Sequence, residues 1–311
     1  MWLFICQSLG IRSSRVSNQA ATEENVRCIL FMIAAMAGFA IEDAVIKQLS
    51  YSMPVSQVLM LIGCGGVLTF GVTAMLTQVN LFTPVVTKPW FVVRTVSELA
   101  SAIFFVIAIV YASLSVSSAI LQATPLAVSL AAALFLKQHV SPRQWILITI
   151  GFFGVLCVIQ PGLDGFKPAA LFAIFGVIFL ALRDAITRSI SVSIPAVAVS
   201  FWAFFALLMA GVVTIPFFAE FSPVTLEYLG LLVVSTLAGT GAYFCVVMAT
   251  RGGDVAVVAP FRYTRLLFAL GLAVIFFDEK VNAMMVLGSS LIIGSGIVMI
   301  VSSGSRRKQI N

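Results

Sequence analysis

The sequence predicts an all-α membrane protein with ten transmembrane helices, arranged as two inverted five-helix repeats with both termini in the cytoplasm. Three observations support this prediction: the composition, the length of the apolar segments and an internal repeat. Of the 311 residues, 61% are hydrophobic and 10% are charged, whereas an average soluble domain has about 25% charged residues. A soluble protein of this size could not bury so much apolar surface, so the expected solvent for much of the chain is lipid.

Ten segments are apolar enough over about 20 residues to span a bilayer as a helix. They run from Cys28 to Lys47, Pro54 to Met75, Trp90 to Tyr111, Val116 to Leu136, Gln144 to Ile159, Pro168 to Thr187, Pro195 to Phe218, Leu226 to Ala249, Val255 to Phe277 and Val281 to Ser302. The short loops leave no room for a separate soluble domain. Residues 1–27 lack the features of a signal peptide and are interpreted as a cytoplasmic tail, as are the basic residues 303–311.

The distribution of lysine and arginine predicts the orientation. With ten crossings from a cytoplasmic N-terminus, 12 of the 18 basic residues fall on the cytoplasmic side, 3 on the outer side and 3 within helices. Cytoplasmic loops carry the excess of basic residues in membrane proteins, so this asymmetry favours the predicted orientation and the count of ten. It also explains the net charge of +6, and the expected partners are a lipid bilayer and a small molecule, without nucleic acid.

An internal repeat relates the two halves of the chain, 28–160 and 168–302. The stretch DAVIKQLSYSMP, which begins at Asp43, matches DAITRSISVSIP, which begins at Asp184, without a gap and at an offset of 141 residues. Each half holds five helices, an odd number, so the second half must enter the membrane from the opposite side. One pattern placed both ways up can open to either face of the membrane.

Two stretches carry a family resemblance: ATPLAVSLAAALFLKQHVS and APFRYTRLLFALGLAVIFFDEKVN, in the fourth helix of each half. With the two five-helix halves, they make the chain similar to the EamA-type members of the drug/metabolite transporter superfamily. In that family both stretches usually end in Gly-Glu. Here the second ends in Asp278-Glu279 and the first in Lys137-Gln138, so only the second half carries the family's carboxylate.

The resemblance implies a secondary transporter that moves a small organic metabolite across the bacterial inner membrane by alternating access. APFRYTRLLFAL and FAIEDAVIKQLSYSMPVSQVLML are most similar to a bacterial branch that includes riboflavin importers. Riboflavin import is therefore the first hypothesis for the substrate, and export of amino acids or related metabolites is the alternative. An intramembrane enzyme or scaffold is a third class, but no HExxH, GxSxG or Walker A motif occurs, so the chain is not expected to be an enzyme or to use ATP.

Ionisable side chains inside the predicted helices mark a binding site or an ion pair, because an unpaired charge in hydrocarbon costs at least a few kcal/mol. Arg262 and Arg265 share one helix face, and Arg265 lies roughly 15 Å from the helix start. They are expected either to bind an acidic or carbonyl-rich substrate group or to pair with Glu98 or backbone carbonyls. The residues predicted to bind substrate are Arg262, Arg265, Tyr263, Phe261, Gln122 and Tyr111.

A second set of charged residues is predicted to serve coupling or gating. Burial favours the protonated form of a carboxyl group, so Glu98 is the candidate for proton coupling, with an ion pair to Arg94 or another arginine as the alternative. Asp43 and Asp184 each precede a basic residue by four positions, Lys47 and Arg188, which predicts either helix-end ion pairs or gates. Glu42 has Arg183 at the matching position, so the two mouths differ in charge. The full set is Glu98, Arg94, Asp43, Asp184 and Glu42.

The remaining patterns predict packing rather than chemistry. The five cysteines are scattered and the single histidine, His139, lies outside the helices, so no metal site and no cofactor are expected. Pro125 and Pro260 lie inside the fourth and ninth predicted helices, where proline permits a kink. Glycines in the fifth and tenth predicted helices favour close helix packing or a homodimer; they are Gly151, Gly154, Gly288, Gly294 and Gly296.

Overall fold

The computed structural model describes residues 10–135, 141–160, 167–188, 195–218, 220–252 and 255–310, and every regular element in these ranges is a helix. The elements are α2 (Gly10–Leu49), α3 (Val55–Leu76), α4 (Pro89–Tyr111), α5 (Leu114–Leu121), α6 (Thr124–Phe135), α7 (Pro142–Ile159), α8 (Ala170–Arg188), α9 (Ala196–Thr214), η1 (Ile215–Phe217), α10 (Leu226–Gly252), α11 (Val255–Val258), η2 (Ala259–Tyr263), α12 (Thr264–Phe277) and α13 (Ala283–Ile310).

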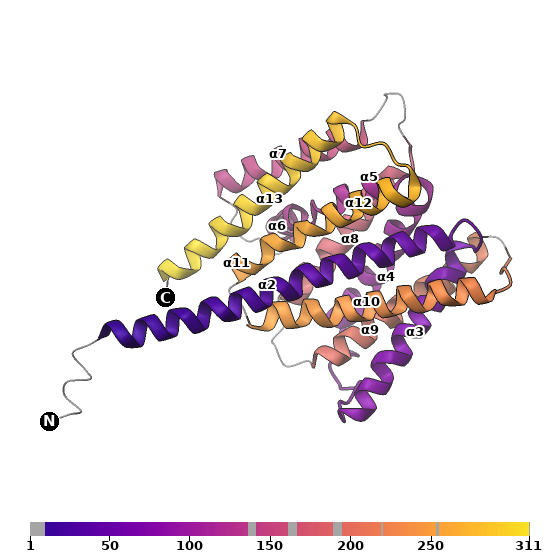
Figure 1. The fold of residues 1–311 in the computed structure, drawn as a ribbon, viewed down its shortest axis with the longest axis horizontal. Coiled ribbons are helices and arrows are strands. Elements are labelled where there is room, and N and C mark those ends of the chain that lie inside the picture. Colours follow the sequence, from indigo (N-terminus) through magenta and orange to yellow (C-terminus); the bar gives the residue numbers. More distant parts are fainter. Residues whose placement is uncertain are drawn as a thin grey trace.

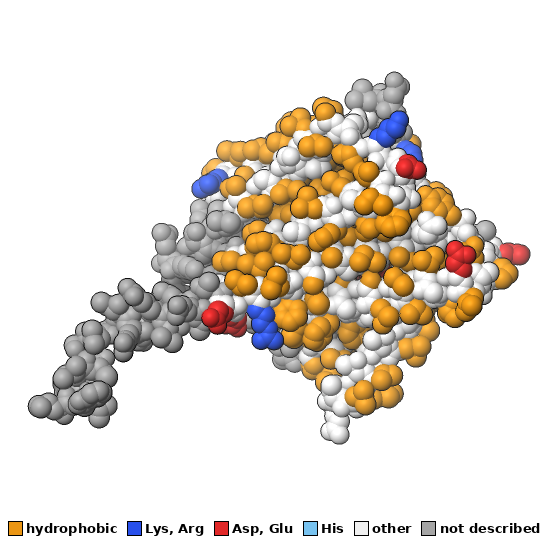
Figure 2. Space-filling model, in the orientation of Figure 1, with side chains coloured by type: hydrophobic (Ala, Val, Ile, Leu, Met, Phe, Trp, Pro, Cys, Tyr) orange, Lys and Arg blue, Asp and Glu red, His pale blue; other side chains and the backbone are white. Residues whose placement is uncertain are grey.

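The prediction of an α-helical membrane protein is confirmed. Among the described residues, seven helices are long and apolar enough to cross a bilayer, or eight if the bent pair α5 and α6 is counted as one span. Each of the ten predicted segments contains helix, although the count of ten crossings stays a prediction. In Figure 2, hydrophobic side chains are spread across the whole visible face, and charged side chains lie mainly near its borders.

Helix extends further than predicted at both ends of the described chain. α2 begins at Gly10, within the expected N-terminal tail, and α13 continues to Ile310, through most of the expected C-terminal tail. The start of α2 and the end of α13 lie at the same end of the molecule (Figure 1). That position agrees with two termini on one side of a membrane, and the cytoplasmic location of both termini stays a prediction.

Four helix pairs dominate the packing: α2 with α10, α4 with α8, α3 with α9, and α7 with α13 (Figure 1). α2 and α8 are the first helices of the two sequence repeats, and α4 and α10 are the third. In both the α2–α10 pair and the α4–α8 pair, the first helix of one half therefore packs on the third helix of the other half. The other two pairs join the second helices and the last helices of the halves. Every dominant pair thus joins one half to the other.

One glycine of α7 and one of α13 bring these two helices into close contact within the chain. A methyl group added at Gly154 would lie 2.8 Å from the carbonyl oxygen of Gly288, and one added at Gly288 would lie 2.5 Å from that of Gly154. These two backbones therefore approach as closely as glycine permits. The predicted homodimer is not tested by this contact.

The fourth segment of each half is interrupted. α5 ends at Leu121 and α6 begins at Thr124, with a bend of 40° between them. In the second half, a 3-10 segment that contains Pro260 separates α11 from α12. The first interruption lies at Gln122 and the second ends at Tyr263, and these positions differ by the same 141 residues that relate the two sequence repeats. Broken helices at corresponding positions of two repeats are typical of substrate sites in transporters.

Candidate functional site

A buried ion pair joins α2 to the start of α12, directly after the second interruption. The Arg265 side chain donates hydrogen bonds to Oδ2 of Asp43 from Nη2 at 2.6 Å and from Nε at 3.2 Å. The guanidinium also lies over two rings, 5.1 Å from the centroid of Phe39 and 5.7 Å from that of Phe105. Cation–π contacts of this kind stabilise a charge that has left water.

The ion pair lies well inside the apolar part of the molecule. Asp43 is six residues before the end of α2 and Arg265 is twelve before the end of α12, so the two Cα atoms lie about 9 Å and 18 Å from those helix ends. A hydrocarbon core is about 30 Å thick. The pair therefore lies where a charge needs a partner.

Glu42 precedes this pair and lies against α10. Its side chain is 8% exposed, and its carboxylate packs against the backbone of Gly239. Within the part of the chain that the structure describes, it has neither a hydrogen bond nor an ion pair. Glu42, Asp43 and Arg265 bring two acids and one base together.

A second charge network joins α4 to α8. Arg183 donates to both carboxylate oxygens of Glu98, at 2.8 and 3.0 Å, and pairs with Asp184 at 2.8 Å. Arg94, one turn before Glu98, pairs with it at 3.3 Å, as the spacing of four predicts. The geometry favours the predicted ion-pair alternative for Glu98. The predicted pairing of Arg265 with Glu98 is wrong, because helix packing brings Asp43 to Arg265.

A third network joins the last turn of α2 to the loop after α12. Lys47 forms an ion pair with Glu279, which also accepts hydrogen bonds from the backbone N–H groups of Leu114 and Ser115 at the start of α5. Burial raises the pKa of Glu279, but the hydrogen bonds from Lys47 and Ser115 outweigh it, so the pKa lies below its usual value. A Lys47–Asp43 pair was predicted from their spacing and is not formed, because both side chains find closer partners on other helices. Its counterpart, Arg188, has a side chain outside the described part.

The third network borders a polar cavity of about 380 Å³. The cavity lies between the start of α5 and the ends of α7 and α12, and its lining includes Ser115, Gln160, Lys167, Glu279 and Asn282. Lys167 donates to the carbonyl oxygen of Ala112 after α4 at 3.0 Å. The charged groups here hold helix ends together and also face open space.

Two of the other predicted substrate-binding residues have contacts away from Arg265. Tyr263 is buried with its hydroxyl against Gly296 of α13, and Gln122 is buried and donates to the carbonyl of Ser118 at 3.4 Å. Arg262 and Phe261 are half-buried in the 3-10 segment. Their predicted role therefore stays a prediction.

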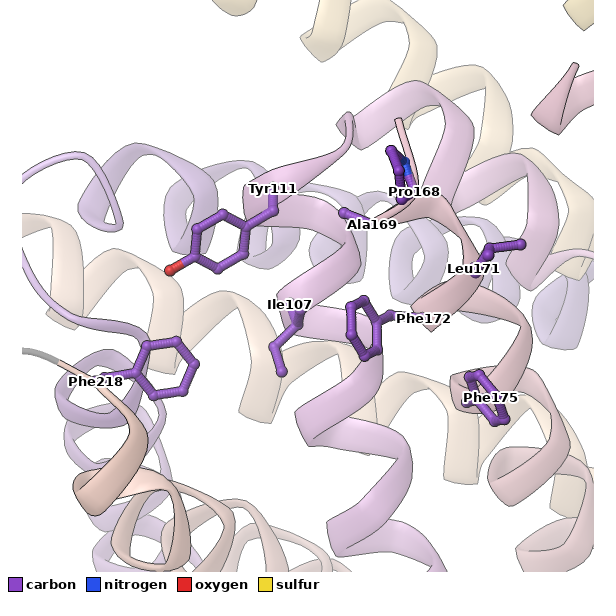
Figure 3. Close-up of a pocket in the computed structure, with 8 residues that line it drawn as sticks. All are labelled: Ile107, Tyr111, Pro168, Ala169, Leu171, Phe172, Phe175 and Phe218. Carbon is purple, nitrogen blue, oxygen red and sulfur yellow. The ribbon is translucent and has the colours of Figure 1, made fainter. Parts of the chain in front are cut away.

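Tyr111 lies in a different place, on the surface. It is 54% exposed and borders an apolar cavity of about 540 Å³ between the end of α4, the start of α8 and Phe218. Figure 3 shows the rings of Tyr111, Phe172 and Phe218 around this cavity. The lining carries no charge, so this surface suits lipid chains better than the charged site at Arg265.

Sequence reasoning missed the aromatic residues that surround the buried charges. Phe39 and Phe105 contact Arg265, and Tyr243 of α10 contacts Phe39 edge-to-face at a centroid distance of 6.2 Å. Phe39 lies four residues before Asp43, one helical turn away, and this spacing could have identified it. Phe105 and Tyr243 lie in apolar stretches, where no charged or polar immediate neighbour in the sequence distinguishes them from lipid-facing or core residues. Among the described residues, no group of three or more His, Cys, Asp or Glu could hold a metal ion.

Comparison with known proteins points to one family. The sequence profile described as the EamA-like transporter family matches residues 26–160 and again residues 167–302. An S-adenosylmethionine uptake transporter of Rickettsia bellii is 26% identical over 57% of this chain and 60% of the relative. A riboflavin transporter of Rhizobium johnstonii is 25% identical over 61% and 63%. The pseudopaline exporter CntI of Pseudomonas aeruginosa is 22% identical over 87% and 95%.

The matches differ in length. The chain spans about 60% of the length of the S-adenosylmethionine transporters that it matches, and nearly all of the exporter's. A chain of 17% identity in a crystal structure has a similar fold, with a TM-score of 0.55 over 86% of this chain and 97% of that chain.

Proposed function

Because the chain belongs to the EamA-like transporter family, we propose that it is a secondary carrier that moves a small organic metabolite across the bacterial inner membrane by alternating access. The observation that carries this proposal is the Asp43–Arg265 ion pair at the interruption before α12. An interrupted helix offers unpaired backbone groups, and a buried charge pair offers strong, directional contacts. A polar solute that leaves water needs both.

The arrangement of the halves supports alternating access between two inverted repeats, 28–160 and 168–302, with ten crossings. Two of the dominant helix pairs, α2–α10 and α4–α8, are equivalent in the two halves, and the other two each join a helix to its own equivalent in the other half. The family profile matches once in each half. A carrier built this way opens to the other side when its two halves exchange conformations. On this proposal both termini are cytoplasmic.

Two of the charge networks suit the role of gates. Glu98 lies in the first half of α4, where it binds Arg183, whereas Ser115, which binds Glu279, lies just beyond the other end of α4. The networks are thus separated along the direction in which α4 runs. If the ion pairs of one network break while those of the other stay formed, the carrier opens to one side of the membrane only. Alternating access requires such one-sided opening.

Riboflavin import is the first specific hypothesis, and the rings of Phe39, Phe105 and Tyr243 near the buried charges suit a flat aromatic group. Amino-acid export is the second, favoured by the charges themselves, because Arg265 suits a carboxylate and Glu42 suits an ammonium group. The names of the relatives support a metabolite carrier in both cases, and they include an importer and an exporter.

The test uses the purified full chain in liposomes and three labelled solutes: riboflavin, S-adenosylmethionine and phenylalanine. Saturable uptake of at least one solute is expected, and Arg265→Ala is expected to reduce it at least about tenfold, a loss equivalent to about 1.4 kcal/mol. The matched control is Leu267→Ala on the same helix, where the side chain is 67% exposed. Uptake of none of the three above protein-free liposomes would contradict the proposal.

A further inference from the structure

Glu42 and Gly239 occupy the same place in one half as Arg183 and Glu98 occupy in the other. The differences 183 − 42 and 239 − 98 are both 141, the offset of the sequence repeat. The structure brings each pair into contact: Arg183 binds Glu98 where α8 packs on α4, and Glu42 packs on Gly239 where α2 packs on α10. One contact therefore occurs twice, with different chemistry.

In the α4–α8 copy the charges are balanced. Glu98 and Asp184 are the acids, and Arg94 and Arg183 are the bases. Each carboxylate has a guanidinium within 3.3 Å. The ion pairs of this copy join side chains of α4 and α8, and Tyr243 of α10 lies close enough to interact electrostatically with Glu98 and Arg183.

In the α2–α10 copy one base is missing. Arg265 binds Asp43, and Lys47, the next base along α2, binds Glu279. The position that would face Glu42 is Gly239, which has no side chain. A buried carboxylate costs free energy unless a cation or a proton neutralises it. Arg265 acts electrostatically on Glu42, but its hydrogen bonds go to Asp43, so the site around Glu42 holds two carboxylates and one guanidinium.

Aromatic rings flank this acid. Phe39 lies three residues before Glu42 on α2, and Tyr243 lies four residues after Gly239 on α10, so both share the face that carries the contact. Their rings meet edge-to-face at a centroid distance of 6.2 Å. The corresponding positions of the other half are Leu180 and Ala102. Aromatic rings beside a carboxylate are typical of sites that bind organic cations, and neither equivalent position in the other half carries a ring.

We propose that Glu42 binds a positively charged group of the transported metabolite, an ammonium or a sulfonium. The group lies beside Glu42 as the Arg183 guanidinium lies beside Glu98, and Phe39 and Tyr243 supply the adjoining apolar wall. This inference rests on the proposed carrier function and narrows its substrate class to organic cations and zwitterions. Arg265 of α12, which binds the adjacent Asp43, then faces the remainder of the same molecule.

The first experiment compares wild type, Glu42→Gln and Glu227→Gln in the three-solute liposome assay. Glu227 is an exposed glutamate in the first turn of α10 and serves as the matched control. S-adenosylmethionine and phenylalanine carry cationic groups and riboflavin does not. Wild type is expected to take up a cationic solute, Glu42→Gln to lower that uptake at least about tenfold at subsaturating concentration, and Glu227→Gln to leave it unchanged.

Two outcomes of this assay would overturn the inference while the carrier function stands. In one, wild type transports riboflavin alone. In the other, Glu42→Gln transports the cationic solute as well as wild type does. Uptake of none of the three solutes would contradict the carrier function itself, and a second measurement then decides the inference independently.

The second measurement tests whether a cation introduced by substitution at position 239 stabilises the protein through Glu42. A side chain added at Gly239 displaces the end of the Glu42 side chain, which can rotate away, rather than backbone. Gly239→Lys is expected to melt at a higher temperature than Gly239→Met of similar length, and this advantage is expected to disappear when Glu42→Gln is added. If the difference in melting temperature between Gly239→Lys and Gly239→Met is the same with Glu42 and with Glu42→Gln, Glu42 does not bind a cation at this position. That result would overturn the inference.

Discussion

The Lys47 ammonium group and the Glu279 carboxylate form an ion pair that fastens the end of α2 to the loop after α12. The same carboxylate accepts hydrogen bonds from the first backbone N–H groups of α5, at 2.8 and 2.9 Å. These N–H groups have no partner within their own helix. One side chain therefore holds together three helices from both halves of the chain.

Glu279→Gln is expected to lower the melting temperature of the detergent-solubilised protein. The substitution leaves the Lys47 charge without its partner, and removal of one partner of a buried ion pair costs about 3 kcal/mol or more. Glu227→Gln, at an exposed position, is the control and should melt like wild type. Equal melting temperatures for Glu279→Gln and wild type would show that the ion pair does not stabilise the fold.

The stabilisation from Glu279 is expected to depend on pH. Its pKa lies below the ordinary value of 4.5 in the folded chain, so the charged form stabilises the fold above that value, and the contribution is lost as the pH falls through the folded-state pKa. The difference in melting temperature between wild type and Glu279→Gln should therefore be largest near neutral pH and shrink below about pH 4.5. A difference that stays constant from pH 7 to pH 3 would contradict this origin.

The Asp43–Arg265 pair should tolerate an exchange of its two charges better than the loss of one. Asp43→Arg and Arg265→Asp each place like charges together in a buried site and should abolish uptake in the liposome assay and lower the melting temperature. The double variant restores opposite charges and is expected to recover at least part of the stability. If the two single losses simply add in the double variant, the residues are not coupled.

Glu98→Gln is expected to destabilise the protein without changing how transport depends on pH. Glu98 binds two arginines, so its neutral replacement leaves Arg94 and Arg183 with less compensation, at a cost of about 3 kcal/mol. Melting curves and uptake at several pH values measure the two effects. A variant that melts like wild type but loses pH-dependent uptake would support proton coupling at Glu98 instead.

The contact between α7 and α13 is tested by two glycine substitutions on one helix. Gly288→Ala places a methyl group 2.5 Å from the carbonyl oxygen of Gly154 and should force the helices apart, lowering the melting temperature. Gly294→Ala meets nothing within 4 Å and should be neutral or stabilise by about 0.5–1 kcal/mol, because alanine is the better helix former. Loss of stability in both variants alike would mean that the close approach is not the cause.

The sequence by itself determined that this chain is an α-helical membrane protein and which segments contain helix, although not where each helix begins, ends or breaks. It also identified the family and the offset of 141 that relates Glu42 to Arg183 and Asp43 to Asp184. Hydropathy and self-similarity are properties of the chain read along its length, and a bilayer forces an apolar stretch of sufficient length into a helix whatever its neighbours are. Such features need no knowledge of packing.

Only the tertiary structure decided which charges meet. Asp43 could pair with Lys47 four residues away, yet it binds Arg265, which lies 222 residues further along the chain. Glu98 similarly gains Arg183 from a distance of 85 residues, and Lys47 gains Glu279 from 232. A buried charge binds the partner that helix packing brings within reach, and packing is set by the shapes of side chains on helices remote in sequence. For the same reason the unbalanced charge at Glu42 became visible only when Gly239 was found opposite it.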